Sequence, residues 1–323
     1  MSRLWITWES QRRNQSTSSA LNAKLIEIAL EDSRFLRYGK SIAITIKAVW
    51  IERPALLFVQ NPSIVLSSLA ILIGAVSPIK IVIDAHNSGL RPLEGRSRFF
   101  NAWADRLARY ADLTIVTSDV LCAHVTTVGG RPALLPDPIP ILKAPLELKR
   151  LVGKHNVLFI CSWADDEPYV DVIAAAKLIA SSTFIYITGN WKKRAAELPE
   201  ILPDNVVLTG FVSNTEFDQL LFSADVILDL TTRDDCMVCG AYEGVAAEKP
   251  LILSSSPVLE AYFDKATIYT ANNTESIAEA IDYAIASLDR LKAESVKFRV
   301  ELGQRWEKLK LNLESHLTQL LKE

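Results

Sequence analysis

The segment from Ala224 to Ser254 reads ADVILDLTTRDDCMVCGAYEGVAAEKPLILS. Its two ends, Ala224–Leu230 and Leu251–Ser254, are short apolar runs that are typical of buried strands. The part between them, Asp235–Pro250, predicts a connecting helix with Glu243 in its first turn. A carboxylate near a helix N-terminus can accept hydroxyl hydrogens, while free backbone N–H groups there attract phosphate. This segment therefore suits a ligand with both ribose hydroxyls and a diphosphate, as a nucleotide-sugar has.

The same alternation of strand and helix runs through the rest of the chain. The predicted strands are Arg3–Trp8, Ala55–Gln60, Ile79–Asp84, Leu113–Thr117, Pro132–Leu135, Asn156–Ser162, Phe184–Thr188, Val206–Thr209, Ala224–Leu230, Leu251–Ser254 and Ala266–Tyr269. Helices are predicted near Ser18–Leu30, Ser41–Trp50, Ile64–Val76, Ser97–Tyr110 and Asp119–Val128, and one or two amphipathic helices over Ala284–Glu323. This order predicts an α/β protein with two Rossmann-like domains, each built on a parallel, doubly wound sheet.

A proline-rich stretch separates the two series of strands. Leu135–Pro145 reads LPDPIPILKAP, and proline disfavours both helices and central strands. We therefore expect one domain over residues 1–145, a second over 146–300, and a C-terminal helix over 301–323 that can cross back to the first. Because ligands of doubly wound sheets bind beyond the carboxyl ends of the strands, two facing domains would form a cleft.

Composition limits the class of protein. The chain of 323 residues is 49% hydrophobic and 23% charged, with a net charge of −3, so no basic field favours nucleic acid. Four scattered cysteines favour a reduced, cytoplasmic setting, and Met1–Ser10 lacks the apolar core of a signal peptide. The apolar run Ile64–Val76 is too short to span a bilayer and predicts a buried helix.

Several segments resemble one enzyme class when taken in order. Asn205–Phe211 (NVVLTGF), Ala224–Leu230 and Asp235–Pro250 resemble the GT-B glycosyltransferases, especially family 4 and its relatives. In that family a strand ending in Gly-Phe is followed by an "aDv" strand and an E-x7-E element, where Asp235 replaces the first glutamate here. In the first half, Gln60–Ser63 (QNPS) and Ile83–Asn87 (IDAHN) are similar to the QNPPS and DWHN of dolichol-linked chitobiose mannosyltransferases.

The resemblance implies a glycosyltransferase of the hexosyltransferase kind. It implies a GT-B architecture in which the second domain binds the nucleotide-sugar donor and the first binds a saccharide or lipid-linked saccharide acceptor. The implied setting is polysaccharide or lipid-linked oligosaccharide assembly, in the cytoplasm or at the inner face of the membrane. The E-x7-E element implies retention of anomeric configuration, whereas the DAHN likeness implies inversion. Neither a metal nor another cofactor is expected, and Cys236 and Cys239 are expected to be two thiols rather than zinc ligands.

The resemblance also assigns candidate site residues. His86, Asp84 and Asp235 are the candidate catalytic residues, with His86 a sugar or transition-state contact and Asp84 an orienting residue or a base. The candidates for donor binding are Glu243, Gly240, Tyr242, Arg233, Gly189, Asn190, Lys192, Arg194, Gly210, Phe211 and Val212.

The chain departs from the family in two places. The family's Arg and Lys after the first strand of the second domain are missing from Ser162–Pro168, and its first Gly-rich loop is replaced by Glu9–Asn14. The diphosphate charge must then be met elsewhere, and the candidates are Lys192, Lys193, Arg194 and Arg233.

Three alternatives stay open. In Arg96–Arg109 (RSRFFNAWADRLAR) the aromatic residues either face the core, or form with the arginines a basic amphipathic face that rests on anionic lipid. For the function, one alternative to a glycosyltransferase is a non-catalytic glycosyltransferase-like subunit that binds a partner enzyme. The missing cations would favour it. Another is a GT-B-fold nucleotide-sugar epimerase.

Overall fold

The computed structural model describes residues 2–61 and 63–323 and divides into two compact units. One unit is Met1–Pro138 with Arg305–Glu323, and the other is Ile139–Gln304. The boundary between Pro138 and Ile139 lies within the proline-rich stretch. Pro62 of the QNPS segment lies outside the described residues.

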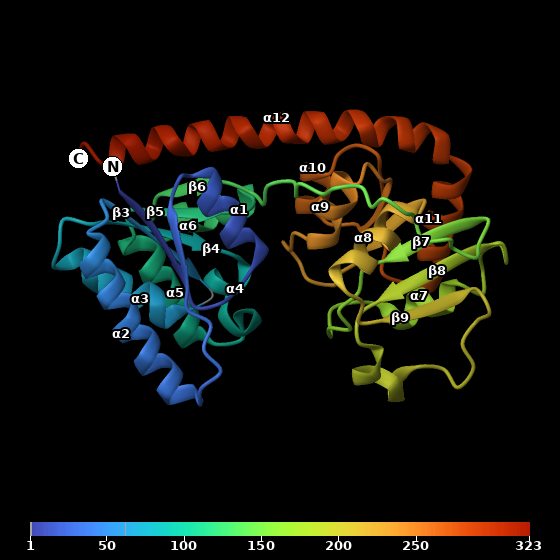
Figure 1. The fold of residues 1–323 in the computed structure, drawn as a ribbon, viewed down its shortest axis with the longest axis horizontal. Helices are drawn as coiled ribbons and strands as arrows, with labels where there is room; N and C mark the ends of the chain where they lie inside the picture. Colours follow the sequence, from blue (N-terminus) through green and yellow to red (C-terminus); the bar gives the residue numbers. More distant parts are fainter. Residues whose placement is uncertain (1, 62) are drawn as a thin grey trace. The chain divides into compact units, whose positions relative to one another are not determined.

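The first unit is built on a parallel six-stranded sheet with the order β2-β1-β3-β4-β5-β6 (Figure 1). Its strands are β1 Arg3–Thr7, β2 Lys24–Glu27, β3 Leu56–Asn61, β4 Lys80–Ala85, β5 Leu113–Val116 and β6 Pro132–Leu134. Its helices are α1 Arg12–Ala20, α2 Arg34–Glu52, α3 Ile64–Ala75, α4 Asn87–Leu90, the short 3-10 helix η1 Pro92–Gly95, α5 Arg98–Tyr110 and α6 Asp119–Thr127.

Apolar side chains cover both faces of this sheet. One core joins strand residues such as Ile6 and Val59 to buried residues of α2, α3, α5 and α6. The other joins Trp5 and Phe58, whose rings stack 5.3 Å apart, to the C-terminal part of α12 (Leu288–Leu320). The end of α12 is held to this unit by the Arg3–Glu314 ion pair, with N–O distances of 2.6 Å.

The second unit repeats the plan, with a parallel sheet in the order β12-β11-β10-β7-β8-β9. Its strands are β7 His155–Phe159, β8 Thr183–Thr188, β9 Val206–Gly210, β10 Val226–Asp229, β11 Leu251–Ser254 and β12 Thr267–Thr270. Its helices are α7 Tyr169–Ala175, the 3-10 helix η2 Trp191–Glu197, α8 Asn214–Ser223, α9 Cys239–Ala246, α10 Pro257–Tyr262, α11 Thr274–Ala286 and the first part of α12. Two separate cores line the two faces of this sheet. The predicted doubly wound α/β architecture is confirmed.

The predicted helix over Ser18–Leu30 is wrong. The helix in this region is α1, which lies earlier, and β2 follows it at the edge of the sheet. Asn22 has a left-handed backbone with φ of 51°, which stops the helix. The four residues of β2 are too few for periodicity to separate a strand from a helix. Every strand predicted from the sequence overlaps an observed strand, and β2 is the observed strand that was not predicted.

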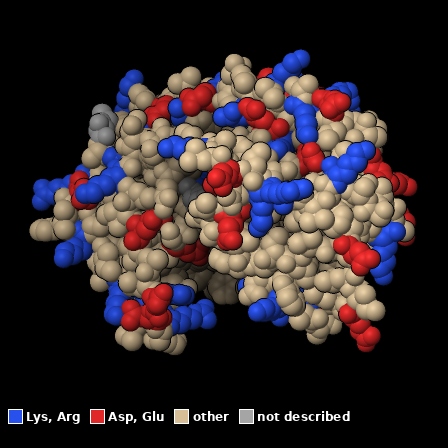
Figure 2. Space-filling model, turned by 45° about the vertical axis from the view of Figure 1, so that its right-hand side comes forward, with Lys and Arg blue, Asp and Glu red and all other residues tan. Residues whose placement is uncertain are grey.

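Two further features bear on the surroundings of the protein. Among the described residues, no helix is long and apolar enough to cross a membrane. On the face drawn in Figure 2, Lys and Arg side chains are interspersed with Asp and Glu, in keeping with the small net charge of −3.

Candidate functional site

The order of the strands marks one crevice in each sheet. In the first unit the chain runs from β1 outward to β2 and then returns to β3 on the other side of β1. In the second unit it runs from β7 through β8 to β9, and then returns to β10 on the other side of β7. Ligands of doubly wound sheets bind at such a reversal, beyond the carboxyl ends of the two strands. The two candidate positions are therefore the ends of β1 and β3 and the ends of β7 and β10.

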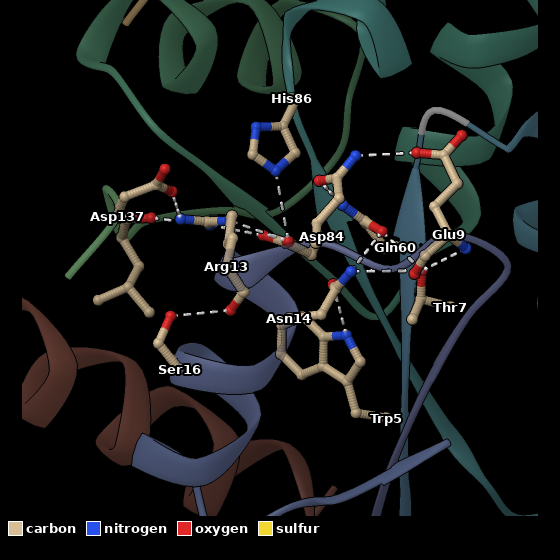
Figure 3. Close-up of polar contacts among 12 residues, drawn as sticks. Trp5, Thr7, Glu9, Arg13, Asn14, Ser16, Gln60, Asp84, His86 and Asp137 are labelled. Atoms are coloured by element: carbon tan, nitrogen blue, oxygen red, sulfur yellow. Dashed lines mark hydrogen bonds and ion pairs between the residues drawn. The ribbon is translucent and has the colours of Figure 1, made fainter. Parts of the chain in front are cut away.

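The chain's own side chains fill the reversal point of the first unit (Figure 3). The Oε1 atom of Gln60 accepts hydrogen bonds from Thr7 Oγ1 at 2.7 Å and from Asn14 Nδ2 at 2.8 Å. Asn14 Oδ1 in turn accepts from Trp5 Nε1 at 3.0 Å. Thr7, Asn14 and Gln60 are all buried, so the chain's own polar side chains occupy this end of the crevice.

A buried ion pair lies beside this network. The Arg13 guanidinium donates to both carboxylate oxygens of Asp84, at 2.7 and 3.1 Å, and to the backbone oxygen of Leu135 at 3.1 Å. It also pairs with Asp137. Burial alone would raise the pKa of Asp84, but the charge and hydrogen bonds of Arg13 outweigh it and hold that pKa below its ordinary value. Asp84 is therefore a fixed carboxylate, which suits an orienting residue better than a base.

His86 lies at the edge of this ion pair, directly after β4. Its Nε2 atom is 3.7 Å from Asp84 Oδ2, and about a quarter of its side chain (28%) reaches solvent. Burial lowers the pKa of His86 below its ordinary value of 6.5, and the charge of Arg13 adds to the effect. The imidazole is therefore neutral at pH 7. A neutral imidazole keeps one ring nitrogen as a hydrogen-bond acceptor, and Nε2 is buried without a hydrogen-bond partner among the described residues.

At the reversal point of the second unit, backbone N–H groups converge on a carboxylate. Glu167 accepts from the backbone N of Ser162 at 3.0 Å, from the backbone N of Ala164 at 2.9 Å and from Ser162 Oγ at 2.9 Å. Convergent N–H groups after the first strand of a doubly wound unit form an anion site. In this chain a carboxylate of the same loop fills part of it.

The loop after β7 is tied to the loop after β10 by Asp166. Its carboxylate accepts from Thr231 Oγ1 at 2.7 Å and lies 3.2 Å from Arg233 Nη2, while its backbone oxygen accepts from the backbone N of Thr232 at 2.7 Å. Arg194 joins the same loop from η2, where it donates to Trp163 O at 3.3 Å and pairs with Asp165. Two of the candidate cations, Arg194 and Arg233, thus lie beside Ser162–Pro168, the segment that lacks the family's Arg and Lys. Arg194 pairs there with Asp165, and Arg233 pairs with Asp166.

A buried acid supports the start of α9. Asp229 ends β10, and its Oδ2 atom accepts from the backbone N of Ala241 at 3.1 Å. A Cβ atom on Gly240 would lie 2.6 Å from the same oxygen, so glycine lets the helix approach this closely. Burial raises the pKa of Asp229 well above its ordinary value, and the carboxylates of Glu167 and Glu243 add to the rise.

The two acids of the E-x7-E-like element occupy different backbone settings. Asp235 is half-buried in the loop before α9, with a left-handed φ of 55°. Glu243 is half-buried on α9, but it is not in the first turn, which contains no acidic residue. That prediction is wrong because Val238 caps the helix and Cys239 begins it, so Glu243 lies one turn further along. Tyr242 is buried and packs against Phe263, with ring centroids 5.2 Å apart, which places its ring in the core.

The remaining donor candidates follow β8 and β9. Gly189 has φ of 86°, and a Cβ atom there would lie 2.2 Å from the backbone oxygen of Cys161, so the loop after β8 can approach the loop after β7 only with glycine. Asn190 and Lys192 are exposed at the start of η2.

Beyond β9, Gly210 also has a left-handed backbone, with φ of 73°. Phe211 is 88% exposed, whereas Val212 packs against a core of the second unit. Phe211 is therefore the member of this group with an open ring face.

Three residues that the sequence analysis did not single out organise these sites: Arg13, Glu167 and Asp229. Asp229 left the clearest signal, since a charged residue near the end of the apolar run ADVILDL must be paired or protonated once it is buried. Arg13 and Glu167 also lie in strand-end segments. The partner of Arg13, Asp84, is distant in sequence, and the partners of Glu167 are mainly backbone N–H groups.

No protein-family model matches this sequence, and no curated protein matches it. Solved structures do match. Sucrose-phosphate synthase from Thermosynechococcus elongatus superposes with a TM-score of 0.77 at 15% identity, over 99% of this chain and 100% of that one. Anabaena HepE in complex with UDP-glucose gives 0.76 at 12% identity, over 99% and 100%. A protein from Listeria monocytogenes assigned as UDP-N-acetylglucosamine 2-epimerase gives 0.62 at 11% identity, over 98% and 88%. The chain therefore has the GT-B fold expected from the sequence.

Proposed function

We propose that this protein is a glycosyltransferase that moves a hexose from a nucleotide-diphosphate-sugar to an acceptor hydroxyl. The observation that carries the proposal is the reversal point of the second unit. There Arg194 from η2 and Arg233 from the loop between β10 and α9 both meet the loop after β7, in a GT-B fold that HepE shares in its complex with UDP-glucose. A saccharide or lipid-linked saccharide is the acceptor that we propose, with polysaccharide or lipid-linked oligosaccharide assembly as the setting.

In this proposal the second unit holds the donor. Glu243 accepts hydrogen bonds from the ribose hydroxyls, and Phe211 and the loops after Gly189 and Gly210 contact the base. Arg194 and Arg233 exchange their aspartate partners for the diphosphate, and Lys192 adds charge. Asp235 contacts the sugar. Stabilising a departing diphosphate is mainly an electrostatic task, which groups fixed before the reaction perform best.

The first unit holds the acceptor near His86. A neutral imidazole can take the acceptor's hydroxyl hydrogen at its unprotonated ring nitrogen. Asp84 is locked by Arg13, so it orients His86 and does not take the proton itself. We propose retention of anomeric configuration from the E-x7-E-like element, with the acceptor oxygen bonding to the anomeric carbon from the face that the diphosphate leaves while His86 takes the hydroxyl proton. A product of inverted configuration, identified by NMR, would instead support the likeness to the chitobiose mannosyltransferases.

The direct test is release of nucleoside diphosphate from a panel of uridine, guanosine and thymidine diphosphate sugars, with a saccharide acceptor present. We expect one donor to give acceptor-dependent release together with a glycosylated product. Isomerised nucleotide-sugar without transfer would identify an epimerase and overturn the proposal. The proposal would also be contradicted if the protein bound one of these nucleotide-sugars but released no nucleoside diphosphate from any of them.

Replacing Glu243 with alanine is expected to weaken donor binding at least about tenfold. A hydrogen bond to a charged group contributes roughly 1.5–3 kcal/mol, and 1.4 kcal/mol corresponds to a factor of ten. Titration calorimetry with the donor found above measures the change. Glu279→Ala, the same substitution on the exposed face of α11, is the matched control and should bind like the wild type. Equal affinity for the Glu243→Ala protein would remove Glu243 from the donor site.

One observation favours a second candidate, the non-catalytic subunit that binds a partner enzyme. Glu167 fills the N–H groups that would meet a phosphate, and Asp165 and Asp166 pair with the two nearby arginines. A chain that had lost donor binding could keep this arrangement without penalty. Absence of binding to every nucleotide-sugar in a thermal-shift screen would favour this candidate, since saturating donor at about 100 times its Kd stabilises by roughly 2.7 kcal/mol.

A further inference from the structure

The helices on one face of the first sheet leave large apolar side chains in solvent. The core side of α5 is formed by Ala104, Leu107 and Ala108, so its aromatic residues do not face the core. Phe99 is 66% exposed and its ring meets those of Phe100 and Trp103 edge-on. On α2, Phe35 is 90% exposed. Of the two alternatives left open for Arg96–Arg109, the one in which the aromatic residues face the core is therefore wrong.

These side chains gather at one edge of the unit. The helices α2, α3 and α5 pack through a common core on the same face of the sheet, and Trp103 Nε1 donates to Ser68 Oγ of α3 at 3.0 Å. Each helix follows a parallel strand, so each begins at the carboxyl edge of the sheet (Figure 1). The exposed apolar residues in the first two turns of these helices form what we call the edge patch: Phe35, Leu36, Val65, Phe99, Phe100 and Trp103. His86 follows β4 at this same edge.

The helices that carry the edge patch are basic, although the chain as a whole is acidic. On α2, four cations accompany one carboxylate; on α5, three cations accompany one carboxylate; and α3 has no charged residue. The cations are Arg34, Arg37, Lys40 and Lys47 on α2, and Arg98, Arg106 and Arg109 on α5. Of these, Arg34, Arg37 and Arg98 lie in the first turns beside the edge patch, whereas Lys40 pairs with Asp32 at 2.6 Å. Over the whole sequence the net charge is −3, so this excess is local.

We propose that the edge patch docks the first unit on the surface of an anionic lipid bilayer. Exposed Phe, Trp and Leu beside Arg and Lys are the composition of segments that rest in the headgroup region, where the rings enter the acyl boundary and the cations meet lipid phosphate. The local excess of cations in a chain of net charge −3 is complementary to an anionic lipid surface, and a protein occupant is an outcome that the test below distinguishes. This docking does not depend on glycosyl transfer. It would bring a lipid-linked acceptor to the edge where His86 lies.

Vesicle flotation of the full chain tests the proposal. We expect the protein to float with vesicles of phosphatidylcholine and phosphatidylglycerol, and roughly tenfold less with phosphatidylcholine alone, because the cations select anionic lipid. About 0.5 M salt should weaken the binding by screening those charges. The Phe35→Ser/Phe99→Ser protein should lose flotation, and Arg34→Glu/Arg98→Glu should lose the preference for anionic lipid.

The matched control is Leu178→Ser/Ile201→Ser, which removes two exposed apolar side chains from the second unit and should float like the wild type. Both pairs of apolar residues are exposed, so unchanged melting curves are expected and would exclude unfolding as the cause. Absence of flotation for the wild type would overturn the proposal, as would equal flotation of the Phe35→Ser/Phe99→Ser protein. The proposal would also be overturned if the wild type formed a dimer in size-exclusion chromatography and the Phe35→Ser/Phe99→Ser protein did not. A second copy of the chain would then cover the edge patch. None of these results depends on a nucleotide-sugar, so the glycosyltransferase proposal is tested separately.

Discussion

Replacing Arg13 with methionine is expected to destabilise the first unit by roughly 3–5 kcal/mol, the usual effect of breaking a buried ion pair by removing one partner. Methionine fills much of the same volume but leaves the Asp84 carboxylate buried without a cation. Because Asp84 has no exposed side-chain surface, water cannot replace the two hydrogen bonds that it loses. In a unit of this size the loss corresponds to a fall in Tm of roughly 6–20 °C, which calorimetry or circular dichroism would measure.

Two comparisons make this result specific. Lys24→Met removes a cation of the same unit whose pair with Glu52 is exposed, and it should change stability by less than about 1 kcal/mol. Arg13→Met/Asp84→Leu removes both buried charges and should be more stable than Arg13→Met alone, because the large penalty comes from the unpaired carboxylate. Equal Tm values for Arg13→Met and Lys24→Met would contradict the role given to Arg13.

The sequence was sufficient for the fold because the strands of a doubly wound sheet are apolar on both faces. Apolar runs such as Ala224–Leu230 and Ile79–Asp84 predict such strands even when the neighbouring strands of the sheet are not known. The exception was β2, an edge strand of four residues with half-buried side chains. At an edge only one neighbour pairs with the strand, so its residues need not be strongly apolar and carry little periodic signal.

The candidate sites were less predictable, since their geometry depends on contacts between distant segments. His86 and Asp84 were found because both follow a strand directly. Arg13 meets Asp84 across 71 positions of sequence, so no local pattern predicts their ion pair. Glu167 is instead close to its partners, but its fixed position comes from backbone N–H groups, which are the same in every sequence. A carboxylate in the segment Ser162–Pro168 could be seen, but its bonds could not.

Replacing His86 with alanine is expected to lower kcat by about 100- to 1000-fold while KM for the donor stays nearly constant, as is typical when a positioned proton-transfer or charge-stabilising group is lost. The donor is held by the second unit in the proposed mechanism, whereas His86 acts on the acceptor hydroxyl. His316→Ala is the matched control, because that imidazole is exposed on α12 and should leave kcat unchanged.

The pH profile adds a second measurement on the same residue. Burial and the charge of Arg13 lower the pKa of His86, so the active neutral form persists as pH falls from 7 through the ordinary value of 6.5. We therefore expect kcat to fall only at pH values below 6.5, and the His86→Ala protein to lack this acid limb. An inflection above 6.5 that His86→Ala removes would show that the imidazole is more readily protonated than its buried position allows. A kcat for His86→Ala within about threefold of the wild type would exclude proton transfer by His86, since that step contributes 100-fold or more.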